Sequence, residues 1–186
     1  MTFKTVQNTD LMIAALEGRL EGVRIALAAG ADINHRNSHG ETSLMGAIVK
    51  GQHEVAEFLI SNGADLNITD NDGWSALKAA VILKDEWMVR LLLHSGASTD
   101  NSDKSGMTLL MFAALSSINI TEELLKHGID MFSRDSIGFS ALDHAVAGER
   151  WGTVDLLLRY GAEESEFSKM KDMQRKVDDA FDEMEP

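Results

Sequence analysis

The chain has 186 residues, of which 44% are hydrophobic and 25% are charged, and its formal net charge is −13. These values are ordinary for a soluble folded protein that forms one domain or one elongated array. The negative charge would repel phosphates, which argues against nucleic acid or an anionic membrane as the main partner and is compatible with a basic protein. No cysteine is present, which excludes disulfides, thiolate nucleophiles and sulfur metal ligands.

Near the N-terminus the apolar run from Leu11 to Leu16 is only six residues long, and Glu17 follows it at once. Such a run is too short for a signal peptide or a membrane span. We therefore expect a cytoplasmic protein that does not use a membrane as its partner.

Two series of glycines repeat along the chain. The first series has intervals of 33, 33, 32 and 33 residues and comprises Gly30, Gly63, Gly96, Gly128 and Gly161. The second series follows the first four of these by ten residues and comprises Gly40, Gly73, Gly106 and Gly138. Two apolar stretches of helical spacing lie between the glycines of each unit. A fixed period of this kind predicts a stack of helix pairs.

The first unit, about residues 9–37, is predicted to begin abruptly at Thr9 and Asp10 without a preceding turn. Its second helix is the alanine-rich stretch from Val23 to Ala29. These features are typical of an end unit that caps a stack of repeats.

The second unit, about residues 38–70, contains His53 with two glutamates in the next four residues, which could begin a metal-binding helix. In register, however, His53 falls where Leu20 and Trp151 stand in other units, and no third ligand lies at a recognisable distance. We therefore predict that His53 is a solvated residue at the start of an ordinary amphipathic helix. We expect no bound metal and no cofactor.

The third unit, about residues 71–103, keeps the full period. The fourth, about residues 104–135, is one residue short near Ser117, and it places Glu123 where other units have an apolar residue. We expect the fourth unit to be the least regular and the least stable of the array.

The fifth unit, about residues 136–164, places Glu164 where other units have an apolar turn residue, so we expect its hairpin to be lost. The remaining residues, 165–186, are predicted to form an acidic amphipathic helix. We expect this helix to cover the exposed side of the last unit; the alternative is a segment that binds a partner or masks the binding face. Its apolar stripe consists of Phe167, Met170, Met173, Val177, Phe181 and Met184.

The motifs of these units resemble the ankyrin repeat over roughly residues 9–164. Each helix-opening stretch has glycine first, a hydroxyl residue third and leucine fifth, as in Gly40–Met45 and Gly73–Lys78, and the turn motif Gly-Ala-Asp-Leu-Asn stands at 63–67. The family's proline and histidine are missing from every unit. The resemblance implies an all-α solenoid of five stacked helix pairs with short turn or hairpin connections, as domain 1–164, followed by a C-terminal helix over 165–186.

Several local roles follow from this pattern. The first-series glycines are predicted to supply positive φ after each second helix. The hydroxyl residues are predicted to cap the first helices, and they are Thr42, Ser75, Thr108 and Ser140. The predicted core consists of Leu11, Leu44, Leu77, Leu110 and Leu142 on first helices, and of Leu27, Leu59, Ile60, Leu92, Leu93, Leu124, Leu125, Leu157 and Leu158 on second helices.

The resemblance also implies that partners contact the turn tips and the exposed side of the first helices. We predict an apolar strip there that binds another protein, in which Trp74, Met107 and Phe139 form a ladder that carries much of the affinity. Alternatively, Trp74 packs on Lys104 or a neighbouring turn and other members lie partly buried between units. The strip consists of Trp74, Ile82, Leu83, Met107, Leu115, Phe132, Ile137 and Phe139.

No phosphate-binding loop, nucleophile elbow or distinctive pair of carboxylates is present in the sequence, so we do not expect an enzyme. The chain is predicted to be a scaffold or adaptor that binds one protein on the concave face and is a monomer when free. The alternative is a specific inhibitor or immunity protein that neutralises a toxin or enzyme with a basic surface. A metallohydrolase is a remote third possibility.

Overall fold

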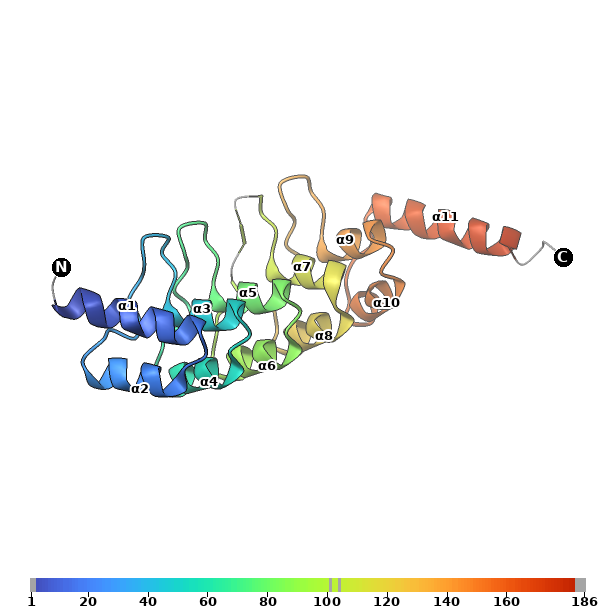
Figure 1. The fold of residues 1–186 in the computed structure, drawn as a ribbon. Helices are drawn as coiled ribbons and strands as arrows, with labels where there is room; N and C mark the ends of the chain where they lie inside the picture. The colour runs from blue at the N-terminus through green and yellow to red at the C-terminus, as the bar shows by residue number, and fades with distance from the viewer. Residues whose placement is uncertain (1–2, 101, 104, 183–186) are drawn as a thin grey trace. The chain divides into compact units, whose positions relative to one another are not determined.

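The computed structural model describes the backbone of residues 3–100, 102–103 and 105–182, and the side chains of residues 6–100, 102–103 and 105–176 (Figure 1). Within these residues the chain forms eleven α-helices and no sheet, and an isolated bridge joins Thr69 to Ser75. The predicted all-α repeat fold is therefore confirmed. The chain forms two compact units, Met1–Asp103 and Lys104–Pro186, and the boundary falls between the third and fourth predicted repeats.

The first compact unit consists of three helix pairs. Each first helix packs against its own second helix, α1 also packs against α3, α3 packs against α5, and α2 packs against α4. The pairs are α1 (Phe3–Leu16) with α2 (Leu20–Ala28), α3 (Ser43–Val49) with α4 (His53–Ser61), and α5 (Ala76–Ile82) with α6 (Glu86–His94).

The second compact unit consists of two helix pairs and one long helix. The first helices α7 and α9 pack together, α8 packs against α10, and the C-terminal helix α11 packs against α9. Within this unit, Figure 1 shows α11 after α7 and α9, whereas no described helix follows α8 and α10. The elements are α7 (Leu109–Ser116), α8 (Ile118–Lys126), α9 (Ala141–Ala147), α10 (Trp151–Arg159) and α11 (Glu166–Asp182).

The predicted leucine ladder forms the core. All five leucines predicted on first helices are buried, and so are Leu59, Leu92, Leu93, Leu124, Leu125 and Leu157 on second helices. Leu27 and Ile60 are half-buried. Leu158 departs from the prediction, because 38% of it is exposed, whereas the equivalent Leu125 is 6% exposed. Leu125 lies on a helix that packs against α10, and α10 has no following second helix among the described residues.

The predicted helix starts and stops are confirmed. The hydroxyl oxygens of Thr42, Ser75, Thr108 and Ser140 each accept a hydrogen bond from the amide three residues later, at 3.2–3.3 Å. The five glycines that follow the second helices all have positive φ, from 75° at Gly128 to 95° at Gly30 and Gly161. Because residues with a Cβ rarely adopt this conformation, glycine at these positions ends each second helix without strain.

The first unit does not begin at Thr9 as predicted. Helix α1 begins at Phe3, well before the expected start. Asn8, on this added segment, is buried, and its side-chain oxygen accepts a hydrogen bond of 2.8 Å from the amide of Asp32. In the next repeat, the equivalent amide of Asp65 donates to Asn34 of the preceding repeat. The added residues of α1 therefore replace a hydrogen bond that a preceding repeat would make.

The short loop of the fourth unit has a clear structural basis. In the other four units the loop between the two helices contains one residue at positive φ: Gly18 (71°), Gly51 (67°), Lys84 (59°) and Glu149 (55°). In the fourth unit this residue is missing, and the extended Ser117 (φ −150°) alone joins α7 to α8 and caps α8. Helix α8 keeps the nine-residue length of the other second helices, whereas α7 has eight residues and α3, α5 and α9 have seven. The irregularity therefore affects the loop and the end of α7.

The C-terminal helix is present as predicted, but it docks through a polar face. Ser168 is buried, and together with Ser165 it donates its hydroxyl to the carboxylate of Asp143 on α9. Farther along, the guanidinium of Arg175 lies 4.2 Å from the centre of the Trp151 ring on α10. These contacts fix the rotation of α11 about its axis.

The helix packs against the last repeat as expected, but only part of its predicted apolar stripe takes part in this packing. Phe167 is half-buried, whereas Met170 and Met173 are 62% and 69% exposed. The side chains of Val177, Phe181 and Met184 lie outside the described residues. The expectation is wrong for Met170 and Met173, because the buried carboxylate of Asp143 and the ring of Trp151 bind the other side of the helix.

None of the helices within the described residues has the length and apolar content needed to cross a membrane.

Candidate functional site

Several candidate binding residues lie at the tips of turns, and an aspartate side chain holds the turns that present Trp74, Ile137 and Phe139. The carboxylate of Asp70 accepts hydrogen bonds from the amides of Asp72 (2.9 Å) and Trp74 (2.8 Å). Asp135 accepts equivalent bonds from Ile137 (3.0 Å) and Phe139 (2.9 Å). A side chain that bonds its own backbone two and four residues on makes a tight, well-defined turn.

The sequence prediction overlooked these turn-holding residues. Asn37, at the boundary between the first and second units, makes the same pair of bonds to the amides of His39 (2.9 Å) and Glu41 (3.0 Å). The recurrence of Asn or Asp four residues before each tip residue was a readable signal. Because these side chains bond the backbone of their own turns, the turns hold Trp74, Ile137 and Phe139 in defined positions.

Trp74 is partly exposed and lies against a buried lysine of the same compact unit. The residue is 40% exposed, and the ammonium of Lys78 lies 5.1 Å from the centre of its indole ring. That ammonium is also 3.5 Å from the carboxylate of Asp103. The aromatic face and the aspartate together offset part of the cost of burying the Lys78 charge.

Phe139 is half-buried in the second compact unit. One side of its ring meets Phe167 of α11, at a centroid distance of 4.8 Å. His144 on α9 approaches edge-on at 5.6 Å. The N-terminal end of the tail helix therefore already covers part of a residue that the sequence assigns to the binding strip.

His144 is also bound to the turn that presents Phe139. The Nε2 atom of His144 lies 2.7 Å from a carboxylate oxygen of Asp135. Burial opposes ionisation of Asp135, but hydrogen bonds from the Phe139 amide, His144 and the Ile137 amide outweigh it and lower the pKa of this carboxyl. Asp135 is thus an ionised anchor for both the turn and the helix behind it.

Phe132 and Ile137 are the most exposed members of the strip, with 60% and 70% of each residue accessible. The amide of Phe132 donates to Asp130 (2.9 Å), so this turn is also held. In two earlier repeats an asparagine stands at the equivalent position and joins its turn to the next one. Asn34 accepts from the amide of Asp65, and Asn67 accepts from the amide of Ser98, each at 2.8 Å.

The phenyl ring of Phe132 cannot accept such a hydrogen bond. This position therefore gives up a structural contact and presents an exposed aromatic side chain instead. An exposed apolar residue that costs the fold a hydrogen bond is a stronger indication of binding than exposure alone.

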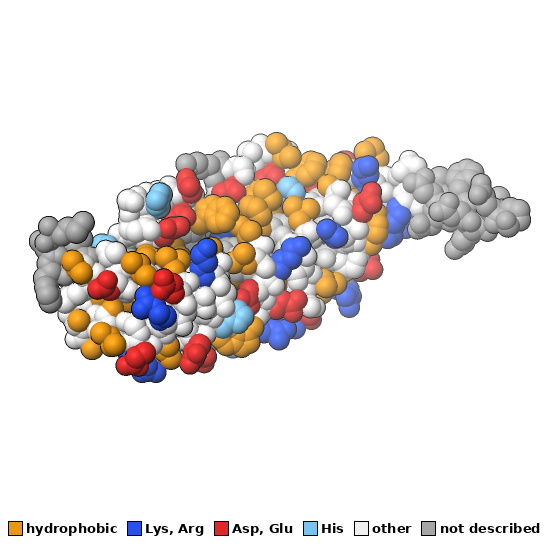
Figure 2. Space-filling view, in the orientation of Figure 1, with side chains coloured by type: hydrophobic (Ala, Val, Ile, Leu, Met, Phe, Trp, Pro, Cys, Tyr) orange, Lys and Arg blue, Asp and Glu red, His pale blue; other side chains and the backbone are white. Residues whose placement is uncertain are grey.

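The remaining strip residues are less accessible. Leu83 is exposed at the end of α5, whereas Ile82, Met107 and Leu115 are half-buried. Leu115 lies so close to Gly148 that a Cβ built there would be 3.0 Å from its Cδ2. Hydrophobic side chains are interspersed with charged ones on the face drawn in Figure 2.

His53 begins α4 and is exposed, as predicted for a residue at a helix start. Its Nε2 lies 2.5 Å from a carboxylate oxygen of Asp85, and its ring lies 5.0 Å from that of Trp87. Asp85 also caps α6 through the amide of Met88, at 3.0 Å. His53 thus takes part in a contact between two neighbouring second helices.

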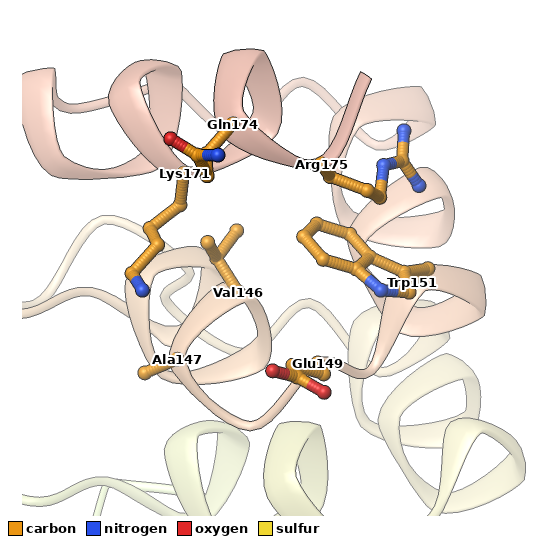
Figure 3. A pocket seen from close by; sticks show the side chains of 7 residues that line it. All are labelled: Val146, Ala147, Glu149, Trp151, Lys171, Gln174 and Arg175. Carbon is orange, nitrogen blue, oxygen red and sulfur yellow. The ribbon is translucent and has the colours of Figure 1, made fainter. Parts of the chain in front are cut away.

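A cavity of about 260 Å³ lies between α11 and the last helix pair (Figure 3). Lys171 borders it from α11, at the helix position that Val146 occupies on α9, six residues after the capping serine in both cases. Arg175 and Trp151 stand on another side, and Glu149 lies at the rim. Because lysine replaces an apolar residue here, the tail packs on the last pair less completely than the repeats pack on each other.

Comparison with known proteins agrees with this architecture. The family model for ankyrin repeats (three copies) matches residues 11–103 and 96–167, which together span most of the chain. A search of curated proteins finds no match. The match to the family model agrees with the helix pairs, the capped first helices and the positive-φ glycines. We conclude that this chain belongs to the ankyrin repeat family.

Proposed function

We propose that this chain is a protein-interaction module, a scaffold or adaptor that binds one partner protein on the face formed by its turn tips and first helices. Ankyrin repeats are generally modules for protein–protein interaction, and no cofactor is needed for this role. The observation that carries the proposal is the presentation of exposed apolar side chains on turns held by hydrogen bonds, above all Phe132 and Ile137.

The exposed strip residues are proposed to make the direct contacts. These are Trp74 and Leu83 in the first compact unit, and Phe132 and Ile137 in the second. Aromatic side chains on rigid supports commonly dominate the affinity of protein interfaces. The half-buried residues Ile82, Met107, Leu115 and Phe139 are proposed to contribute their accessible parts and to support the exposed ones.

The direct test is affinity capture from a lysate of the source cell, with the full chain as bait. The double variant Phe132→Ala and Ile137→Ala should lose the captured protein while its thermal midpoint stays close to that of the parent, because both side chains are largely exposed. The matched control is Ile25→Ala, which truncates a residue of 61% exposure on α2 outside the strip. Equal capture by parent and double variant would place the binding surface elsewhere.

A second candidate function is specific inhibition of a toxin or enzyme with a basic surface. The net charge of −13 favours it, as do the carboxylates of Asp70, Asp72 and Asp130 beside the apolar tips. Such a complex should weaken steeply as salt is added, because steering between opposite charges is screened. A scaffold held by apolar contacts should show a weak salt dependence, and it should leave any activity of its partner intact.

A further inference from the structure

The second helix of the last repeat, α10, begins differently from the other second helices. In α2, α4 and α6 the first turn contains a glutamate, which complements the positive end of the helix dipole. In α8 the hydroxyl of Ser117 caps the helix and accepts a hydrogen bond of 3.4 Å from the amide of Ile120. Helix α10, all of whose residues are described, has no acid in its first turn, and Arg150 at its cap position makes no side-chain cap. The start of α10 therefore combines the positive end of the helix dipole with a guanidinium.

The repeat register shows what Arg150 replaces. The equivalent residue in the third repeat is Asp85, whose carboxylate accepts a hydrogen bond of 3.0 Å from an amide in the first turn of α6. In the second repeat it is Gln52, which donates to the carbonyl of Leu16 at 3.4 Å. The Nε of Arg150 donates to the equivalent carbonyl, that of Leu115, at 3.0 Å. This bond orients the guanidinium, whose other two nitrogens have neither an acceptor nor a carboxylate partner among the described residues.

A hollow of about 280 Å³ lies beside the start of α10. In the first unit the loop between the helices places Gly18 against Gln52, so closely that a Cβ built on the glycine would clash with that side chain. The fourth unit lacks this loop residue, because Ser117 alone joins α7 to α8. The short loop therefore leaves open the space beside Arg150. The residues that line the hollow include Ser117, Ile118, Arg150, Trp151, Gly152 and Thr153.

Thr153 lines the hollow from the first turn of α10 and is only 5% exposed. The buried Thr121 on α8 donates its hydroxyl to the carbonyl of Ser117 at 2.8 Å, whereas the hydroxyl of Thr153 makes no hydrogen bond within the described residues. Among these residues, the side-chain atom that is both sealed from solvent and unpaired is Nε of Arg175. The Thr153 hydroxyl therefore reaches solvent, and the hollow is the opening beside it.

The backbone adds two further donors. The amides of Trp151 and Gly152 donate to no acceptor in the part of the chain that the structure describes. Buried or partly buried donors are usually paired, because an unpaired one is costly. The hollow thus brings together a guanidinium, a hydroxyl and two amides that all lack an acceptor.

We propose that the hollow at the start of α10 is a binding site for a phosphate monoester. The guanidinium of Arg150 and the hydroxyl of Thr153 donate to the phosphate oxygens, as do the free amides of the first turn. A phosphate monoester carries about two negative charges at neutral pH and three acceptor oxygens. It therefore offsets both the dipole and the guanidinium, and it satisfies more of these donors than the two oxygens of a carboxylate.

The hollow is larger than a phosphate group alone. A second hollow, of about 500 Å³, lies between α8 and α10 and shares Ile118 with the first. Leu156 and Tyr160 line it and offer apolar surface to the group that carries the phosphate. A phosphorylated side chain of another protein therefore fits the two hollows better than inorganic phosphate does.

No residue of the binding strip lines the first hollow, so the proposal does not depend on the proposed function. The net charge of −13 repels phosphates at long range, but at physiological salt this repulsion is screened beyond about 8 Å. We therefore expect inorganic phosphate to bind weakly, through the local donors.

The test is an NMR titration of the isotope-labelled full chain with inorganic phosphate and with a blocked phosphoserine. The amides of Trp151, Gly152 and Thr153 should shift to saturation, whereas that of Gly63 in the first compact unit should not move. Blocked serine without phosphate, and acetate, should cause no saturable shift. Tighter binding of phosphoserine than of phosphate supports a phosphorylated side chain as the ligand. Equal or weaker binding of phosphoserine assigns the site to free phosphate.

Two variants test the donors. Arg150→Gln should weaken phosphate binding about tenfold or more, because a hydrogen bond from a charged group is lost. Glutamine here can still donate to the carbonyl of Leu115, as Gln52 does to that of Leu16, so the thermal midpoint should match the parent. Thr153→Val keeps the shape of the side chain and should weaken binding about fivefold.

The matched control is Lys169→Gln, which removes one positive charge from an exposed residue of the same compact unit, outside the hollow. It should bind phosphate like the parent. The absence of a saturable shift with either phosphate or phosphoserine, unchanged binding by Arg150→Gln or Thr153→Val, an equal loss in Lys169→Gln, or binding of acetate as tight as that of phosphate would each overturn the proposal.

Discussion

The hydroxyl of Ser168 on α11 donates a hydrogen bond to the carboxylate of Asp143 on α9, twenty-five residues earlier in the chain. Asp143 is 1% exposed and also accepts from Ser165 and from the amide and hydroxyl of Ser140. The same carboxylate thus closes the start of α9 and holds the tail helix. A single buried acid couples the last repeat to the C-terminus.

We predict that Ser168→Ala loosens the tail without unfolding the repeats. The change leaves a buried carboxylate short of one donor, which typically costs about 1–3 kcal/mol. Amide hydrogen exchange in α11 should become faster, while exchange in α7 and α9 stays slow. The control is Ser133→Ala, whose hydroxyl bonds Asp130 on an exposed turn. Faster exchange throughout the second compact unit would show that Ser168 supports the repeats themselves.

Tail docking should also depend on pH. Burial raises the pKa of Asp143, but the hydrogen bonds from Ser165, Ser168 and Ser140 outweigh this effect, so its pKa in the folded chain lies below the ordinary value. A lowered pKa means that the stabilisation is complete above the unfolded pKa of about 3.9 and is lost as the pH falls through the folded value.

Acidification below about pH 4 should therefore release α11. This can be followed by limited proteolysis of the tail with an acid-active protease. The variant Asp143→Asn should show a weakly held tail already at neutral pH and little further change on acidification. A parent tail that remains protected at a pH where Asp143 is protonated would contradict the prediction.

Glu149→Gly is predicted to stabilise the protein. Glu149 has φ +55°, a conformation that costs a residue with a Cβ roughly 1–2 kcal/mol. Glycine removes this strain, but it gives the unfolded chain more freedom, so we expect a net gain of about 0.5–1 kcal/mol. Lys84→Gly should behave in the same way.

The matched control is Gly51→Ala, at the equivalent place in the second repeat. Gly51 has φ +67° and open space around the position where a Cβ would be placed, so the substitution introduces backbone strain alone. Chemical denaturation should show the opposite sign of change for the two variants. A loss of stability in Glu149→Gly would mean that the glutamate side chain contributes more than its backbone strain costs.

Phe132→Asn should raise stability and lower affinity. Asparagine at this position can accept a hydrogen bond from the amide of Glu163, 31 residues later, as Asn34 does from Asp65 and Asn67 from Ser98. One such bond is worth about 0.5–1.5 kcal/mol. Removal of an aromatic anchor commonly costs 2 kcal/mol or more, roughly a thirtyfold loss of affinity.

Measurement of both the thermal midpoint and the dissociation constant of the captured partner separates the two effects. If affinity is unchanged while the midpoint rises, Phe132 lies outside the interface. If the midpoint falls, the phenyl ring has a packing role that its exposure conceals.

The regular parts of the fold could be predicted from the sequence because they depend on local rules. Leu44 and Leu77 are buried, Thr42 and Ser75 cap their helices, and Gly63 and Gly96 adopt positive φ, as the period implies. The tail could not be predicted to the same depth. Its apolar periodicity is real, but the docked face is decided by Asp143 and Trp151, which are distant in sequence.

The candidate site, like the fold, could be predicted only in part from the sequence. The register identified Trp74 and Phe139 as equivalent tip residues, and both are held by an aspartate four residues earlier. The repeat period does not predict which side chains surround these two residues. Lys78 lies beside Trp74, whereas Phe167 covers one side of Phe139.

The contact between Phe139 and Phe167 has a consequence for binding energetics. The phenyl ring of Phe139 lies between Phe167 and His144, so it has little torsional freedom to lose on binding. A partner that contacts the open edge of this ring would therefore pay a smaller entropic cost of association. Through this contact the tail helix limits the motion of one residue of the proposed strip. We therefore predict that Phe167 contributes to the affinity of the proposed strip through the rigidity that it gives to Phe139.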